Sequence, residues 1–224
     1  MIYKGVIFDL DGTLADTLAD IAGSMNRVLK ANGFPVHPVD DYKLLVGRGL
    51  DNLVLQSLPG DARTPGVAAA LLSEMIDDYN VHCLDETCLY TGIRSLLSQL
   101  ATLAIKMAVF SNKAEPLTVK IVEQLLADVE FVQVMGARPD FPKKPDPAGA
   151  LVISNKMGLP PHEIVYVGDS DVDMITATRA GMLAVGVVWG FRSSDELLNH
   201  GAKFLLNQAS GLIPVLEGVT NLSD

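Results

Sequence analysis

Short apolar runs alternate with segments of helical periodicity along most of this chain. The runs have the length of buried strands and lie at 5–8, 104–110, 131–135, 164–167, 183–188 and 203–206. Helical patterns lie between the later runs at 115–127, 147–157, 171–180 and 194–200. This alternation predicts an α/β fold in which helices cover both faces of a parallel sheet. Right-handed crossovers then bring the carboxyl ends of the strands to one edge of the sheet.

A block without strand patterns separates the first apolar run from the others. Residues 17–32 carry apolar side chains at helical spacing. Shorter helical pieces, broken by glycines and prolines, follow at 40–46, 50–58 and 65–79. We expect this block to form a small helical cap, residues 16–84, inserted after the first strand of an α/β core made of residues 1–15 and 85–224.

The composition narrows the classes of protein to consider. The chain has 224 residues, 49% of them hydrophobic, which is ample for a sizeable core. Its formal net charge of −10 argues against a nucleic-acid partner, because a polyanion is repelled at long range. No apolar run approaches the length of a membrane span, and the first residues lack a signal-peptide pattern. The only cysteines, Cys83 and Cys88, favour reduced thiols. We therefore expect a cytoplasmic protein without membrane or nucleic-acid partners, and no protein partner is evident.

Two carboxylates stand where the first apolar run ends. Asp9 and Asp11 are separated only by Leu10 and are followed by Gly12 and Thr13. Ligands of open α/β sheets bind at this edge of the strands. The pair suits a carboxylate nucleophile beside a group that moves protons, with a hard divalent ion that offsets the repulsion. Asp and Gly are also common in ordinary turns, so the pair alone leaves both interpretations open.

Polar groups of complementary kinds follow other apolar runs. Ser111 and Asn112 come after 104–110 and could hold phosphate oxygens, although either could simply cap a helix. Lys144 precedes Pro145, whose fixed dihedral could hold a lysine pointing into the site, whereas surface lysines are usually solvated.

A second acidic pair follows the run at 164–167. Asp169 lies at the predicted strand tip and Asp173 one helical turn further on, so both can face one point. Acidic residues also stabilise the first turn of a helix, and we expect Asp171 to do so. A chance assembly of two carboxylate pairs, a hydroxyl and a lysine at one sheet edge would be rare.

In this order, the residues closely resemble the signatures of the haloacid dehalogenase superfamily. Phe-Asp-Leu-Asp-Gly-Thr-Leu at 8–14 is similar to the first signature. The other three resemblances are Ser111-Asn112, Lys144-Pro145, and Gly168-Asp169-Ser170 with Asp173. The helical block resembles the cap of the phosphoglycolate phosphatase-like branch. The resemblance implies a Rossmann-like parallel core and a Mg²⁺-dependent phosphatase that hydrolyses a small phosphorylated metabolite, similar to phosphoglycolate, through an aspartyl-phosphate.

The resemblance also implies the catalytic and metal-binding roles. Asp9 would be the nucleophile, and Asp11 would protonate the leaving group and then deprotonate water. Mg²⁺ would be held by Asp9, the backbone carbonyl of Asp11 and Asp169, with Asp173 as a direct ligand or through water.

The remaining roles concern the phosphoryl group and the cap. Ser111, Asn112 and Lys144 would neutralise the phosphoryl oxygens, and Thr13 would orient Asp11 or support its loop. Lys143 is the weaker lysine candidate, because only Lys144 directly precedes proline. Arg48 lies between two glycines, and in caps of this type it could bind a second anionic group of the substrate, or else be a solvated turn residue.

Two other functions stay open. A sugar phosphomutase of the β-phosphoglucomutase type would share this core and cap, although the Asp-Gly-Thr segment favours hydrolysis. A non-catalytic protein that binds a phosphorylated ligand would also share the fold, but every catalytic position is filled.

Overall fold

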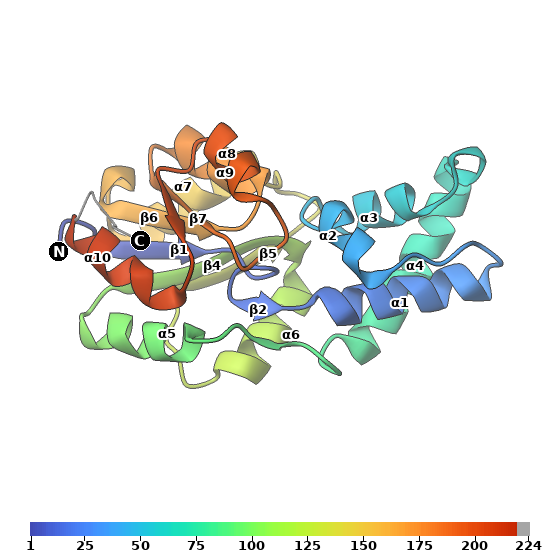
Figure 1. Ribbon diagram of the computed structural model, residues 1–224, viewed down its shortest axis with the longest axis horizontal. Coiled ribbons are helices and arrows are strands. Elements are labelled where there is room, and N and C mark those ends of the chain that lie inside the picture. The colour runs from blue at the N-terminus through green and yellow to red at the C-terminus, as the bar shows by residue number, and fades with distance from the viewer. Residues whose placement is uncertain (219–224) are drawn as a thin grey trace.

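The main sheet of the protein is parallel throughout. The computed structural model describes residues 1–218 and has six strands in the order β5-β4-β1-β6-β7-β8 (Figure 1). The strands are β1 (Gly5–Phe8), β4 (Lys106–Ala114), β5 (Gln133–Ala137), β6 (Ile164–Gly168), β7 (Leu183–Val187) and β8 (Phe204–Leu206). Every neighbouring pair runs parallel, which confirms the predicted α/β fold.

Helices cover both faces of this sheet. One face packs against α5 (Ile93–Thr102), α6 (Glu115–Leu126) and α10 (Leu212–Glu217). The other packs against α7 (Ala148–Met157), α8 (Asp171–Ala180) and α9 (Ser194–Asn199). Because strand side chains alternate between faces, Val6 and Phe8 of β1 join the first apolar cluster and Ile7 joins the second. Burial on both faces explains why the central strands are apolar without alternation.

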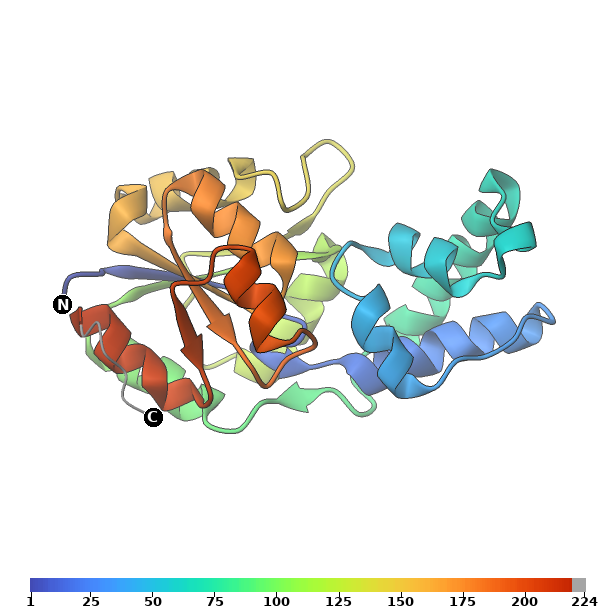
Figure 2. The ribbon, with the colours of Figure 1, turned by 45° about the horizontal axis from the view of Figure 1, so that its top comes forward.

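The helices between β1 and α5 form a group beside the carboxyl edge of the sheet (Figures 1 and 2). They are α1 (Leu18–Ala31), α2 (Tyr42–Leu45), α3 (Leu50–Ser57) and α4 (Pro65–His82). The start of α4 has clear local causes: Thr64 Oγ1 accepts a hydrogen bond from the amide of Val67, and proline occupies the first turn. No helix within residues 1–218 is long and apolar enough to cross a membrane.

The structure differs from the sequence predictions in three places. β4 continues to Ala114, so Ser111 and Asn112 lie inside a strand rather than after one. Two-residue strands, β2 (Ala15–Asp16) and β3 (Cys88–Leu89), pair antiparallel on either side of the helical group, and they are too short to produce an alternating pattern. The sequence analysis also missed α10, which packs its apolar side chains against the core.

Candidate active site

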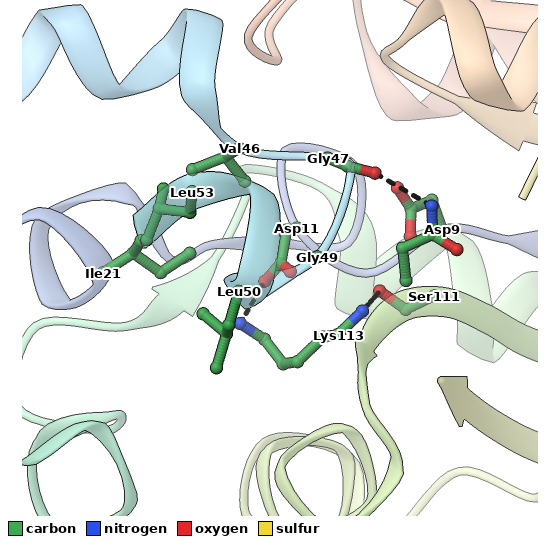
Figure 3. A pocket seen from close by; sticks show the side chains of 11 residues that line it. Asp9, Asp11, Ile21, Val46, Gly47, Gly49, Leu50, Leu53, Ser111 and Lys113 are labelled. Carbon is green, nitrogen blue, oxygen red and sulfur yellow. Dashed lines mark hydrogen bonds and ion pairs between the residues drawn. The ribbon is translucent and has the colours of Figure 1, made fainter. Parts of the chain in front are cut away.

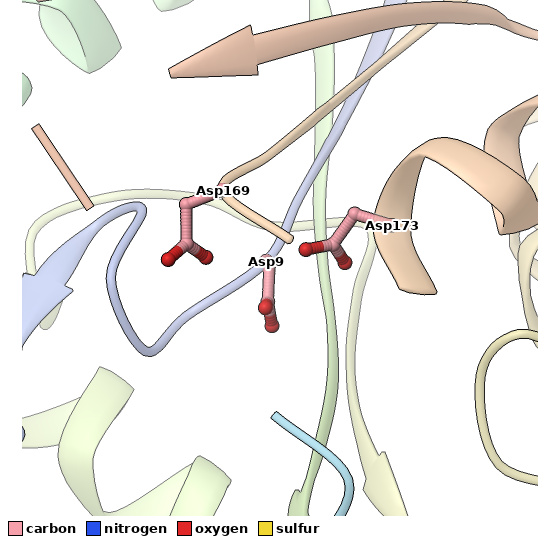
Figure 4. Close-up of side chains that lie close together, drawn as sticks. All are labelled: Asp9, Asp169 and Asp173. Atoms are coloured by element: carbon pink, nitrogen blue, oxygen red, sulfur yellow. The ribbon is translucent and has the colours of Figure 1, made fainter. Parts of the chain in front are cut away.

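Neighbouring strands bring three carboxylates together. Phe8 of β1 is paired with Val167 of β6, so Asp9 and Asp169 emerge side by side where the two strands end. Asp173 comes from the first turn of α8 and faces them (Figure 4). All three side chains are buried, and one oxygen of each lies within 4.8 Å of the others. The structure therefore brings Asp9 of the first acidic pair together with Asp169 and Asp173 of the second.

Lys144 is the cation that the structure places against this cluster. Its Nζ lies 2.9 Å from Asp9 Oδ1 and 2.6 Å from Asp173 Oδ1, and only 1% of the side chain is exposed. Lys143 instead extends outward to Asp51, with 2.6 Å between Nζ and Oδ1. Of the two adjacent lysines, the one before proline is in the site.

One ammonium leaves excess negative charge among three carboxylates. The pKa of Asp9 is raised to about 7, first by burial and then by the charge of Asp173, while Lys144 opposes both. Burial also raises the pKa of Asp169 well above its ordinary value, and the charges of Asp173 and Asp9 add to that effect. A divalent cation would relieve this repulsion, so the donor set fits a hard metal ion.

The three carboxylates are not equally free to bind such an ion. Asp173 uses Oδ1 for Lys144 and Oδ2 for the amide and hydroxyl of Ser170, which form a capping box at the start of α8. Asp169 accepts a backbone hydrogen bond from Phe191 at 2.7 Å and one from Thr13 Oγ1 at 3.3 Å. Asp9 and Asp169 thus keep more lone pairs available, and Asp173 fits a role through water.

Glycines permit the close approach of backbone to Asp169. Gly12 has a φ of +79°, and a Cβ there would lie 2.2 Å from Asp169 Oδ2. A Cβ at Gly190 would lie 2.3 Å from Asp169 Cβ. The turn after β1 and the segment after β7 therefore pack directly on this carboxylate.

Asp11 lies apart from the acidic trio, on the side of the helical group. Its Oδ1 accepts hydrogen bonds from Thr17 Oγ1 at 2.7 Å and lies 3.0 Å from Lys113 Nζ. Thr13, predicted to orient Asp11 or to support its loop, donates its hydroxyl to Asp169. Thr17 lies at the start of α1 but makes no side-chain cap there, because its hydroxyl is directed to Asp11.

Ser111 and Asn112 differ in what they offer a phosphate. Ser111 Oγ accepts the amide of Lys113 and retains its own proton to donate. Asn112 accepts the amide of Lys144 at 2.8 Å and donates to the carbonyls of Lys144 and Gly47, both at 3.0 Å. The side chain of Asn112 therefore orients Lys144 and holds the turn before α3.

A pocket opens between the core and the helical group (Figure 3). It has an empty volume of about 390 Å³, including its open mouth. The core lines it with polar residues: Asp9, Asp11, Ser111, Asn112 and Lys113. The helical group lines it with Ile21, Val46, Gly47, Gly49, Leu50 and Leu53.

Arg48 does not line this pocket. Its Nη2 lies 2.5 Å from Asp171 Oδ2, so the guanidinium links the turn between α2 and α3 to the first turn of α8. Arg192 and Asn112 hold the same turn by hydrogen bonds to the carbonyls of Val46 and Gly47.

The acidic trio and the buried lysine lie at the carboxyl edge of a parallel sheet, beside a helical insert. This combination is typical of one class of hydrolases. A model of the haloacid dehalogenase-like hydrolase family matches residues 6–187, and the chain belongs to that family. A phosphoglycolate phosphatase of Chromobacterium violaceum is 31% identical over 218 residues, which cover 96% of each chain. Another, of Yersinia pestis, is 27% identical and covers 99% of this chain and 96% of its own.

A solved structure agrees with these relatives. A crystal structure from Lactobacillus delbrueckii subsp. bulgaricus, provisionally described as a phosphoglycolate phosphatase, has a TM-score of 0.91 and 29% identity. The match covers 96% of this chain and 99% of that one. The predicted family is confirmed, and the chain is an enzyme of the phosphoric monoester hydrolase class.

Proposed function

We propose that this enzyme is a Mg²⁺-dependent phosphatase that acts on a small phosphorylated metabolite through an aspartyl-phosphate on Asp9. The observation that carries the proposal is the position of Asp9. Asp9 lines the pocket, 2.9 Å from the buried Lys144 ammonium and within the acidic trio. A carboxylate there can attack phosphorus while a cation holds the phosphoryl oxygens.

The reaction would proceed in two transfers. A carboxylate oxygen of Asp9 attacks phosphorus, and the bond from phosphorus to the leaving oxygen breaks. Asp11 gives its proton to that oxygen. Water then attacks the aspartyl-phosphate and loses a proton to Asp11, which releases phosphate and regenerates Asp9.

Other residues stabilise the charge that develops on the phosphoryl group. Lys144 and the hydroxyl of Ser111 would contact its oxygens, while Asn112 keeps Lys144 in place. Asp9, Asp169 and the backbone carbonyl of Asp11 would hold Mg²⁺, with Asp173 acting through water. When bound, the ion neutralises phosphoryl oxygens and the carboxylate cluster.

The relatives support a substrate similar to phosphoglycolate, because two that match nearly the whole length of this chain are named for that activity. Residues 16–84 would act as the cap that excludes water and selects the leaving group. The two unbonded cysteines fit a cytoplasmic enzyme, and the only partner proposed is the small phosphorylated substrate.

The test is hydrolysis of p-nitrophenyl phosphate and phosphoglycolate by purified enzyme with Mg²⁺ or chelator, comparing wild type with Asp9→Asn. We expect Asp9→Asn to lose turnover on both substrates, because an amide is a poor nucleophile. Asp40→Asn, which changes an aspartate whose side chain is 83% exposed, should keep full activity. Clear hydrolysis by Asp9→Asn would assign the attack to another residue, and isomerisation of a sugar 1-phosphate without net hydrolysis would identify a mutase.

A further inference from the structure

A second buried lysine in the pocket contacts the proton-transfer residue rather than the nucleophile. Lys113 lies on β4 with its side chain 2% exposed, and its Nζ is 3.0 Å from Asp11 Oδ1 (Figure 3). The same Nζ donates a hydrogen bond to the hydroxyl of Tyr79 at 2.8 Å and lies 4.6 Å from the centroid of that ring. Tyr79 belongs to α4, so one ammonium joins a strand of the core, a catalytic carboxyl group and a helix of the cap.

A buried ammonium is costly unless it is paired, and here it has an ion-pair partner in Asp11 and a hydrogen-bond partner in Tyr79. Burial alone lowers the pKa of Lys113, but Asp11 and Tyr79 outweigh it, and the pKa lies above its ordinary value. Lys113 is therefore a fixed positive charge. Its place beside Asp11 is not explained by phosphate binding, because Lys144 is the ammonium that lies against Asp9.

The contacts of Asp11 are asymmetric. Both Lys113 and Thr17 bind Oδ1, at 3.0 and 2.7 Å. Within residues 1–218, Oδ2 accepts no hydrogen bond, and Oδ1 is the oxygen nearer to the Lys113 ammonium. A hydrogen bond from Thr17 and the ion pair with Lys113 thus hold Asp11 mainly through Oδ1, while Oδ2 keeps its hydrogen-bonding capacity.

We propose that Lys113 is the positioning residue for proton transfer, with its ammonium, tethered to α4 by Tyr79, fixing Oδ1 of Asp11 so that Oδ2 exchanges the proton. The inference rests on the proposed phosphatase function. The proton balance closes over the cycle: Oδ2 gives its proton to the leaving alkoxide and regains one from the water that attacks the aspartyl-phosphate.

This role makes the effect of a substitution depend on the leaving group. An alkoxide needs a proton as it departs, whereas nitrophenolate departs without one. Loss of Lys113 should therefore slow phosphoenzyme formation from an alkyl phosphate but not from p-nitrophenyl phosphate. Hydrolysis of the phosphoenzyme uses Asp11 as a base for either substrate, so that step should slow for both.

The experiment measures kcat and kcat/KM for Lys113→Met with phosphoglycolate and p-nitrophenyl phosphate, together with pre-steady-state release of nitrophenolate. We expect kcat/KM to fall about 10–100-fold for phosphoglycolate, a part of the usual effect of a general acid, and to stay within about 3-fold for p-nitrophenyl phosphate. With the latter, kcat should fall and a burst of nitrophenolate should appear, because the second step becomes limiting.

Three further variants make the result specific. Asp11→Asn should show the same dependence on the leaving group, with a larger loss. Tyr79→Phe keeps the ring but removes the hydroxyl, and should show a weaker form of the same pattern even if Lys113→Met fails to fold. Lys120→Met is the control, because Lys120 also reaches α4, through the carbonyl of Asn80, but does not touch Asp11. Lys120→Met should have the same kcat and kcat/KM as wild type on both substrates.

The outcomes separate this inference from the function on which it rests. An inactive wild type, or an Asp11→Asn variant with no dependence on the leaving group, would overturn the proposed mechanism as well. If Asp11→Asn shows the pattern while Lys113→Met loses kcat/KM equally on both substrates, or on neither, only the positioning role of Lys113 is overturned.

Discussion

Removal of the Lys144 ammonium should destabilise the metal-free enzyme more than any substitution of a surface lysine. In Lys144→Met, the acidic trio would keep its burial but lose the lysine that contacts it among residues 1–218. Removing one partner of a buried ion pair costs about 3–5 kcal/mol, because the other charge stays buried and uncompensated. For a chain of this size, that loss corresponds to a fall in Tm of about 6–20 °C.

The assay is thermal unfolding in chelator at pH 8, with Lys143→Met as the matched control. Lys143 is the preceding residue and has its own ion pair, but that pair is exposed and contributes only about 0–1 kcal/mol. Mg²⁺ should restore part of the lost stability of Lys144→Met, because a cation returns to the carboxylates. It should not restore activity if Lys144 binds the phosphoryl oxygens as we propose.

The pH dependence gives a second check of the same reasoning. The pKa of Asp9 is higher in the folded protein, about 7, than its ordinary value of 3.8. A carboxyl group whose pKa is raised on folding adds to the free energy of unfolding at low pH. This stabilisation is lost as the pH rises through the pKa of the folded state. The stability deficit of Lys144→Met should therefore be smaller at pH 5.5 than at pH 8. Equal melting temperatures for Lys144→Met and Lys143→Met in chelator at pH 8 would refute the argument.

Three further predictions concern the metal and the cap. Asp169→Ala should raise the Mg²⁺ concentration needed for activity, since it deletes a proposed carboxylate ligand, and a Mg²⁺ titration that matches wild type would remove Asp169 from the ligand set. Mg²⁺ should raise the Tm of the wild type more at pH 8 than at pH 5.5, because protons on Asp9 and Asp169 compete with the ion; a constant shift would contradict the raised pKa values. If Arg48 leaves Asp171 to bind a second substrate anion, Arg48→Ala should lower kcat/KM for phosphoglycolate by an amount that corresponds to about 1.5–3 kcal/mol of lost transition-state stabilisation. The value of kcat/KM for p-nitrophenyl phosphate should not change, whereas equal losses on both substrates would assign Arg48 to the link with α8.

The sequence predicts the sheet well because its strands are buried on both faces. Continuous apolar runs of strand length mark β1, β6 and β7 within one or two residues of their observed bounds. Strand ends at a common edge also predict that Asp9 and Asp169 meet. This part of the site follows from local pattern and topology alone.

The roles of individual side chains depend on contacts that no local pattern contains. Lys113 was missed because the apolar run stops at Phe110, while the strand continues to Ala114 with an irregular register. Its partner Tyr79 lies 34 residues away in the sequence. The hydroxyl on Asp11 comes from Thr17 rather than Thr13, since the direction of each side chain depends on the turn between them. The one available signal was that Lys113 directly follows Ser111-Asn112.

The two structural roles of Asp173 affect what an aspartate at this position indicates when sequences of relatives are compared. Its carboxylate both binds Lys144 and completes the capping box of α8. Selection for a stable α8 alone would keep an aspartate there, even in a descendant that had lost its metal and its turnover. An aspartate at this position is therefore a poor marker of retained catalysis, whereas Asp9, whose burial beside like charges brings the fold no such benefit, is a better one.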